Sequence, residues 1–269
     1  PFPEMPTAPG LPQLSDALRS EAGVMSEPCP KCGGTGFEVS DGAEGVAVSI
    51  RCSCSVRDRA DRILRAARIP RRYEHCSFDN FEVWQPTLEP ALAWAREWFE
   101  RWPLQVDVGL LFVGPPGTGK THLAVGLLRE LASRKGAKIV FAEQRQLLKE
   151  LQSTFDGGAG RNETDVLTPV LDAEVLLLDD LGAGRTTAWA QDVMHDVLAH
   201  RYNRKLPTIM TTNRATGDDD DDTAAPADAP TLRDRLGDAL MSRIYEMCRV
   251  IPVTGEDFRR RVLHARHRF

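Results

Sequence analysis

The sequence has no run of about 18 or more apolar residues, the length that a membrane-spanning helix requires. Its first 28 residues contain six prolines and lack the basic-then-apolar pattern of a secretory signal peptide. No internal repeat is visible. These absences disfavour a membrane-spanning or secreted protein, and we therefore expect a cytoplasmic one.

A strong net charge is also absent. The 269 residues include 34 Lys and Arg and 39 Asp and Glu, which gives a net charge of −5. Asp218 to Asp222 and Asp228 supply six of the acids within one low-complexity stretch, and without them the balance is +1. Residues 51–72 contain eight arginines and two aspartates. This composition suits contact with phosphates or with an acidic protein surface, and equally a solvated helix face.

Composition and patterning divide the chain into four parts. We expect residues 1–28 to form a flexible, Pro-rich arm, 29–54 a compact cysteine-bearing module, and 55–75 an Arg-rich helical connector with one apolar stripe. Residues 76–269 form the main domain. Within it, residues 215–231 are rich in Asp, Ala and Pro and cannot bury an apolar face, which predicts a surface insertion.

The main domain alternates short apolar segments with amphipathic ones, which is the pattern of an α/β fold with a parallel sheet. Strands are predicted at 110–113, 139–142, 175–178, 208–211 and 250–253. Helices are predicted at 88–102, 121–133, 144–154, 187–203 and 232–247, where apolar residues recur at three- and four-residue spacing.

The residues after the first predicted strand read GPPGTGKT, which matches the phosphate-loop pattern of a glycine, four residues and then Gly-Lys-Thr. The backbone N–H groups of such a loop, and the start of the next helix, point at phosphates. The lysine supplies a positive charge to the β- and γ-phosphates, and the threonine a hydroxyl ligand for Mg²⁺. The predicted nucleotide-binding residues are therefore Gly114, Pro115, Pro116, Gly117, Thr118, Gly119, Lys120 and Thr121.

Polar side chains follow two other predicted strands. Asp179 and Asp180 come directly after the apolar segment 175–178. We expect Asp179 to hold Mg²⁺ and Asp180 to orient the attacking water near the γ-phosphate of ATP. Asn213 closes the segment TIMTTN, in position to contact the γ-phosphate or the water, although a turn cap has the same appearance in a sequence.

Four cysteines occur as two chelating pairs, Cys29 with Cys32 and Cys52 with Cys54, separated by 19 residues. Two close pairs of thiolates suit tetrahedral Zn²⁺, and disulfides are the weaker explanation in a cytosolic protein. Four cysteine ligands leave no open coordination position, so the predicted zinc is structural.

Read together, GPPGTGKTHLA, VLLLDDLG, TTN and RLGDALMSRIYEMCRVIPVTGEDFR resemble the DnaC/DnaI helicase-loader and IstB-like branch of the AAA+ ATPases. The resemblance covers about residues 69–262, and CPKCGGTGF with the later CSC resembles the zinc-binding N-terminal modules of bacterial loaders.

This resemblance implies an AAA+ phosphate-loop fold with a five-stranded parallel sheet and a nucleotide bound between subunits of an oligomer. It implies that Arg243 acts as an arginine finger in trans, that Arg259 senses phosphate in its own subunit, and that Asn213 is the sensor asparagine. The chain departs from AAA+ proteins in general at Asp180, where most carry glutamate, and in the acidic insertion after Asn213.

Three functions agree with these motifs. The first is an ATP-dependent loader of a replicative DNA helicase onto single-stranded DNA, in which the zinc module and the connector bind the helicase. The second is an IstB-like transposition helper that acts with a transposase on duplex DNA; the zinc module argues against this function. The third is a nucleotide-dependent adaptor without significant turnover; the intact Lys120, Asp179 and Asp180 argue against it. We expect the first, an ATPase that uses ATP, Mg²⁺ and structural Zn²⁺ and contacts a replicative helicase, single-stranded DNA and further copies of itself.

Overall fold

A computed structural model describes residues 29–41, 47–106, 108–155, 162–184, 187–217 and 229–260. The arm expected at 1–28 and residues 218–228 of the expected insertion lie outside this range. The chain divides into two compact units between Ser55 and Val56, so the second unit includes most of the predicted connector. No helix among the described residues has both the length and the apolar character to cross a membrane.

The first unit contains a β-hairpin. Strands β1 (Phe37–Asp41) and β2 (Ala47–Arg51) pair in antiparallel fashion. Helix α1 (Ser53–Ala66) begins two residues after β2 and continues into the second unit. The apolar side chains of the hairpin are between 44 and 75% exposed: Phe37, Val39, Val48 and Ile50. In the described part of this unit only Cys32 and Cys52 are buried, so the hairpin has no apolar core of its own.

The second unit is built on one five-stranded sheet. Its strands are β3 (Gly109–Val113), β4 (Ile139–Glu143), β5 (Val175–Asp179), β6 (Thr208–Thr212) and β7 (Cys248–Pro252). They lie in the order β4-β5-β6-β3-β7, and every neighbouring pair is parallel. The predicted five-stranded parallel sheet is therefore confirmed.

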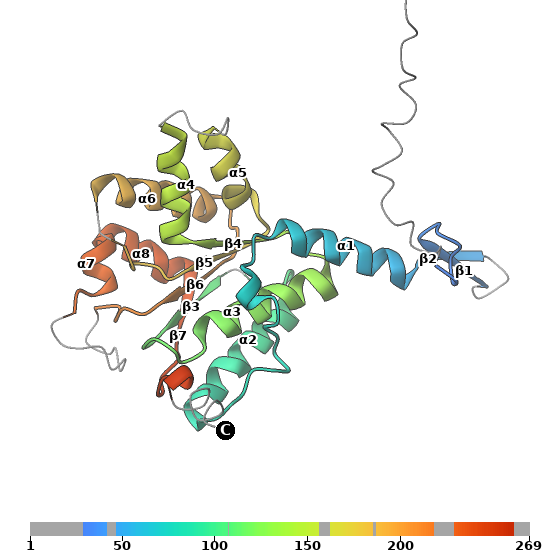
Figure 1. Cartoon of the computed structure of the whole chain (residues 1–269), viewed down its shortest axis with the longest axis horizontal. Helices are drawn as coiled ribbons and strands as arrows, with labels where there is room; N and C mark the ends of the chain where they lie inside the picture. Colours follow the sequence, from blue (N-terminus) through green and yellow to red (C-terminus); the bar gives the residue numbers. More distant parts are fainter. Residues whose placement is uncertain are drawn as a thin grey trace, which may run out of the picture. The chain divides into compact units, whose positions relative to one another are not determined.

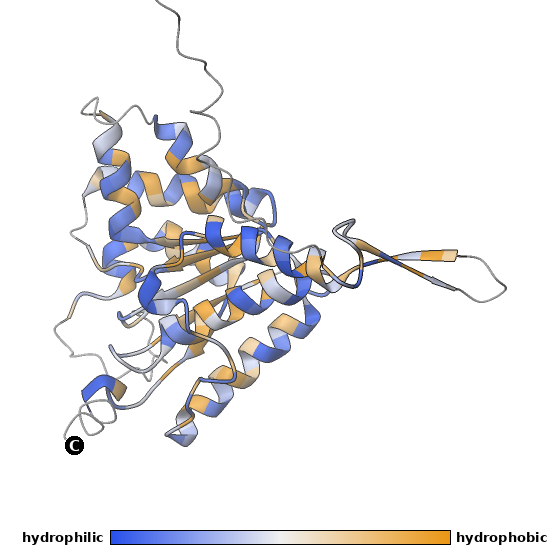
Figure 2. Ribbon diagram, turned by 45° about the vertical axis from the view of Figure 1, so that its right-hand side comes forward, coloured by the Kyte–Doolittle hydropathy of each residue, from blue (hydrophilic) through white to orange (hydrophobic). Residues whose placement is uncertain are grey.

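Helices cover both faces of this sheet (Figure 1). Leu110 and Phe112 of β3 pack toward α2 (Glu89–Arg101) and α3 (Lys120–Glu130), whereas Leu111 and Val113 belong to the core on the other face. That second core includes α4 (Gln144–Phe155), α5 (Glu163–Asp172), α6 (Ala188–Asn203), α7 (Leu232–Leu236) and α8 (Asp238–Met247). Shorter segments are η2 (Arg71–Tyr73), η3 (Pro86–Leu88) and the π-helical turn η4 (Leu131–Lys135). Apolar residues gather along the strands and on the helix faces toward them (Figure 2).

Two helices differ from the sequence prediction. The single helix predicted over 232–247 is divided at Gly237, whose φ of 83° is outside the helical region and favours glycine. Helix α5 was not predicted, since it is short and contains Pro169. A capping box starts it, in which Asn162 and Asp165 each accept the backbone N–H of the other.

The described residues on either side of 218–228 lie next to each other. The N–H of Leu232 donates to Ala215 O at 2.7 Å, and the N–H of Arg233 donates to Thr216 O at 3.2 Å. Thr231 caps α7 by accepting the N–H of Asp234. Both ends of the acidic insertion are therefore fixed to the fold just after β6.

A buried arginine links α5, α6 and β6. The guanidinium of Arg201, which is 0% exposed, donates to three carbonyls at the end of α5: Val170 O at 3.0 Å, Leu171 O at 3.2 Å and Ala173 O at 3.0 Å. It also donates to Pro207 O and to the Thr208 hydroxyl at the start of β6. Burial lowers its pKa to about 10, so it stays charged at neutral pH. The carbonyls at a helix end have no partner within the helix, and Arg201 supplies one.

We predict that Arg201→Met lowers the free energy of unfolding by roughly 3–5 kcal/mol, because buried carbonyls lose their donor. Urea denaturation measures the change. The matched control is Arg204→Met on the same helix end. Arg204 forms an exposed ion pair with Asp172 at 2.7 Å, and its loss should cost less than about 1 kcal/mol. Equal losses in the two variants would contradict the role given to Arg201.

Candidate nucleotide site and cysteine cluster

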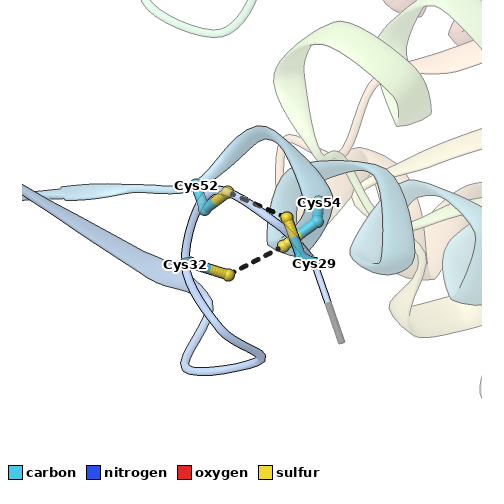
Figure 3. Close-up of side chains that lie close together, drawn as sticks. All are labelled: Cys29, Cys32, Cys52 and Cys54. Carbon is cyan, nitrogen blue, oxygen red and sulfur yellow. Dashed lines mark hydrogen bonds between the residues drawn. The ribbon is translucent and has the colours of Figure 1, made fainter. Parts of the chain in front are cut away.

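The four cysteines of the first unit gather beside the hairpin (Figure 3). Cys29 Sγ lies 3.8 Å from Cys52 Sγ, and Cys32 Sγ lies 3.4 Å from Cys54 Sγ. Sulfurs around zinc, at about 2.3 Å from the metal, lie about 3.8 Å apart in a tetrahedron. A disulfide bond, at about 2.05 Å, would be far shorter. The hairpin brings the two pairs together, and the spacing fits a zinc ion.

Backbone amides favour a thiolate in this cluster. The N–H of Gly36 donates to Cys32 Sγ at 3.3 Å. Burial opposes the charged form of Cys32, but this amide and its neighbours outweigh burial and lower the pKa of the thiol to about 6. The hydrogen bond with Cys32 raises the pKa of Cys54 to about 12. A bound metal ion would replace the protons that such thiols hold.

The phosphate loop of the second unit follows β3, and α3 begins at Lys120. Gly117 and Gly119 have φ values of 83° and 98°, which favour glycine. A Cβ on Gly117 would lie 1.9 Å from the Asp257 carboxylate, and one on Gly119 would lie 2.9 Å from the Phe81 ring. Both positions therefore favour glycine; the motif pattern specifies Gly119, whereas Gly117 is one of its four variable residues.

Lys120 lies inside the loop. Its side chain is buried, and the ammonium donates to Gly114 O at 2.8 Å and to Pro115 O at 2.7 Å. Burial lowers the pKa of Lys120 to about 8, and the nearby Asp180 and Asp179 carboxylates oppose that shift. A cation held in this way can transfer its hydrogen bonds to a phosphate.

The buried carboxylate of Asp179 lies at the end of β5. Its Oδ1 accepts hydrogen bonds from the Thr121 hydroxyl at 2.9 Å and the Thr211 hydroxyl at 2.6 Å. Burial raises the pKa of Asp179, and these two hydroxyls lower it in part. A hydroxyl beside a carboxylate is an oxygen donor set that Mg²⁺ accepts. No role was predicted for Thr211, and the sequence gives it no distinct signal because three of the five residues of β6 are threonines.

Asp180 and Asn213 meet although they lie 33 positions apart in the sequence. Asn213 Nδ2 donates to Asp180 Oδ1 at 2.7 Å, and the N–H of Asp180 donates to Thr211 Oγ1 at 3.0 Å. Asp180 has a φ of 57°, in the left-handed region that aspartate tolerates better than most residues. Such backbone geometry concentrates at functional sites.

Lys120, Thr121, Asp179, Asp180 and Asn213 line one pocket of about 830 Å³, whereas Thr211 lies behind Asp179 and outside that lining. The pocket also has a wall from outside the phosphate-loop motifs, which includes Tyr73, Phe81, Trp84, Leu88 and Phe258. The rings of Trp84 and Phe258 are 6.1 Å apart. An aromatic wall next to a phosphate loop offers a surface on which a nucleobase can stack. The sequence signal for it was the clustering of aromatic residues between Tyr73 and Trp84.

The two C-terminal arginines have different locations. Arg259 lines the pocket beside Phe258. Arg243, on α8, lies outside the pocket lining, with its Nη1 3.1 Å from His195 Nε2 and its guanidinium 5.6 Å from the centre of the Tyr202 ring. Arg243 is therefore not part of the pocket of its own chain.

The family model of the IstB-like ATP binding protein matches residues 57–265, more than three quarters of the chain. The chain belongs to this family. The phosphate loop, the five-stranded parallel sheet and the order of the motifs are those of an AAA+ ATPase.

The similar proteins include a replicative helicase loader and a protein of an insertion sequence. The replicative helicase loader DnaC of Escherichia coli (strain K12) is 28% identical over 141 residues, 52% of this chain and 56% of that protein. The chain thus matches little more than half the length of DnaC. A protein of Mycobacterium tuberculosis (strain ATCC 25618 / H37Rv), named as ATP-binding in an insertion sequence, is 31% identical over 186 residues, 66% of this chain and 72% of that protein.

Solved structures agree with this assignment. A crystal structure of the DnaC helicase loader has a TM-score of 0.58 and 30% identity, covering 68% of this chain and 99% of that one. A crystal structure of DnaI has a TM-score of 0.56 and 23% identity, covering 68% and 94%, which is a likeness of fold. The IstB-like family match begins at residue 57, so the four cysteines lie before it.

We predict one zinc ion per chain in the cysteine cluster, held by Cys29, Cys32, Cys52 and Cys54. In each single Cys→Ser variant of these four cysteines, elemental analysis of the purified full chain should show loss of this zinc ion. The reason is that the variant lacks one of the four thiolate ligands. Cys248→Ser, at a buried cysteine of the other unit, is the control. Full occupancy of this site in the Cys52→Ser and Cys54→Ser variants would contradict the four-thiolate site.

Proposed function

We propose that this IstB-like family member is an ATP-hydrolysing switch that loads a replicative DNA helicase onto single-stranded DNA. The observation that carries the proposal is the complete set of Lys120, Thr121, Asp179, Asp180 and Asn213 around one pocket. The similarity to DnaC helicase loaders supports the choice of partner. We also propose a cytoplasmic location, which is consistent with this function.

The phosphate loop binds the nucleotide in this proposal. Lys120 exchanges its two backbone carbonyl partners for β- and γ-phosphate oxygens, while the loop N–H groups and the start of α3 contact the phosphates. Thr121 and Asp179 hold Mg²⁺, which neutralises phosphate charge when bound. The aromatic wall packs against the base.

In this proposal, ATP hydrolysis depends on four further side chains that act near the γ-phosphate. Asp180 orients the attacking water, and Asn213, hydrogen-bonded to it, fixes the direction of the carboxylate. Arg259 contacts the phosphates of its own subunit. Arg243 contacts the nucleotide of a neighbouring subunit, which agrees with its place outside its own pocket. Self-association through the ATPase unit then completes the site.

The cysteine module and the Arg-rich α1 are the parts we propose to bind the helicase. Among the residues of α1, Arg57, Arg62 and Arg65 are exposed, and the hairpin displays apolar side chains. The ATPase unit would bind single-stranded DNA and control release.

A second candidate is a transposition helper that acts with a transposase on duplex DNA. The relative in a Mycobacterium tuberculosis insertion sequence and the IstB-like family match favour it. The cysteine module before residue 57 argues against it, because the family match does not include that region. A third candidate, an adaptor without turnover, is disfavoured by the paired Asp180 and Asn213.

Affinity capture of the full chain from its native host, with and without a non-hydrolysable ATP analogue, tests the choice of partner. A replicative helicase should copurify, and the Cys52→Ser/Cys54→Ser variant should lose it while still binding ATP. Capture of a transposase in place of the helicase would favour the second candidate and overturn the first.

We predict that Asp180→Asn keeps ATP affinity and slows hydrolysis by roughly 100-fold, because it removes the charge that orients water and leaves Thr121 and Asp179. Titration with ATP and single-turnover hydrolysis measure the two effects. Lys120→Ala is the reference and should lose binding. If Asp180→Asn lost binding while hydrolysis per bound nucleotide was unchanged, the roles of Asp179 and Asp180 would be exchanged.

We further predict that ATPase activity per chain rises with protein concentration and that Arg243→Ala loses this rise while it still binds ATP. Mixing Arg243→Ala with Lys120→Ala should restore activity, since a neighbour pair then combines one intact loop with one intact arginine. Activity that does not depend on concentration, together with normal turnover of Arg243→Ala, would exclude a shared site.

A further inference from the structure

A second group of metal-binding side chains lies in the ATPase unit, apart from the four cysteines. His75, Cys76 and His122 each place one ligand atom within 4.8 Å of the others. We propose that these three side chains bind a transition-metal ion, with zinc as the best match, on the wall of the nucleotide pocket.

The fold brings the three residues together from two segments. His75 and Cys76 follow η2, and His122 lies in the first turn of α3, directly after Thr121. All three line the 830 Å³ pocket. The rings of His75 and His122 meet edge to face with centroids 5.9 Å apart. Neither histidine, nor Cys76, has a part in the proposed ATP chemistry.

Asn80 holds this arrangement. Its Nδ2 donates to His75 O at 2.6 Å, and its Oδ1 accepts the N–H of Ser77 at 2.8 Å and lies 2.9 Å from His122 Nε2. The imidazole of His122 also lies 3.3 Å from Ser77 O. One amide therefore ties the His122 ring to the backbone that carries His75 and Cys76. Hydrogen bonds of this kind orient histidine ligands in known metal sites.

The chemistry of the side chains selects the ion. Two imidazoles and a thiolate are nitrogen and sulfur donors, which suit zinc and not the oxygen-seeking Mg²⁺ of the neighbouring phosphate site. Ligand atoms bound to zinc lie about 3.5 Å apart, by the usual bond lengths. His75 is exposed, so rotation of its ring can shorten the present separations between ligand atoms, whereas Cys76 is only 1% exposed.

Three protein ligands leave one coordination position open. Because His122 adjoins Thr121, a bound ion would join the segment 75–80 to the helix that begins with Lys120. The aromatic wall and the phosphate loop would then be held in one geometry. Binding to the folded state alone would raise the thermal stability of this unit.

Zinc stoichiometry of the full chain tests the proposal. After equilibrium dialysis against zinc, wild type should hold two ions per chain, and His75→Asn, which changes an exposed side chain, should hold one. A chain with Cys29, Cys32, Cys52 and Cys54 all replaced by Ser should keep one ion, and adding Cys76→Ser should remove it. Cys248→Ser, at another buried thiol, is the matched control and should change neither count.

Cobalt provides a second readout in the four-serine chain. A thiolate ligand should give a sulfur-to-cobalt charge-transfer band, and Cys76→Ser should abolish it while Cys248→Ser preserves it. The proposal is overturned if the four-serine chain binds ATP but no zinc. It is also overturned if His75→Asn and Cys76→Ser hold as much zinc as Cys248→Ser.

Discussion

The two hydrogen bonds accepted by Asp179 join elements that are far apart in the sequence. Thr121 on α3, Asp179 on β5 and Thr211 on β6 meet at one carboxylate oxygen. They can meet because β5, β6 and β3 are adjacent and parallel, so their C-terminal ends share one edge of the sheet. A shift of one residue in register would turn Thr211 to the opposite face. The pocket geometry, including the Asp180–Asn213 pair, thus depends on strand register.

The parts of this site that local sequence encodes were predictable. Short apolar strands and the glycines around Lys120 have strong local signals, and their positions agree with the structure. Thr211 and the aromatic wall could not be derived in this way, because their roles arise from strand pairing and from the packing of Trp84 on Phe258. Helix α5 was missed because its start depends on a polar capping box and Pro169 interrupts its pattern.

The two units achieve stability by different physical means. The second buries two apolar cores on a sheet and satisfies the end of α5 with Arg201. The described part of the first unit buries only two cysteines, and its hairpin side chains face solvent. A small unit of this kind commonly depends on a metal for its fold. The exposed apolar residues are then available to a partner, because they are not needed for a core.

The IstB-like match covers the ATPase unit and begins after the cysteines. Relatives named as a helicase loader and as an insertion-sequence protein align with 52% and 66% of this chain. A nucleotide site shared between such relatives cannot by itself determine which partner is bound. Partner choice must therefore depend on surfaces outside the shared motifs. Among the described residues, the exposed arginines of α1 and the cysteine hairpin meet this condition, and the hairpin combines exposed apolar side chains with a cluster of four thiols that fits a metal ion.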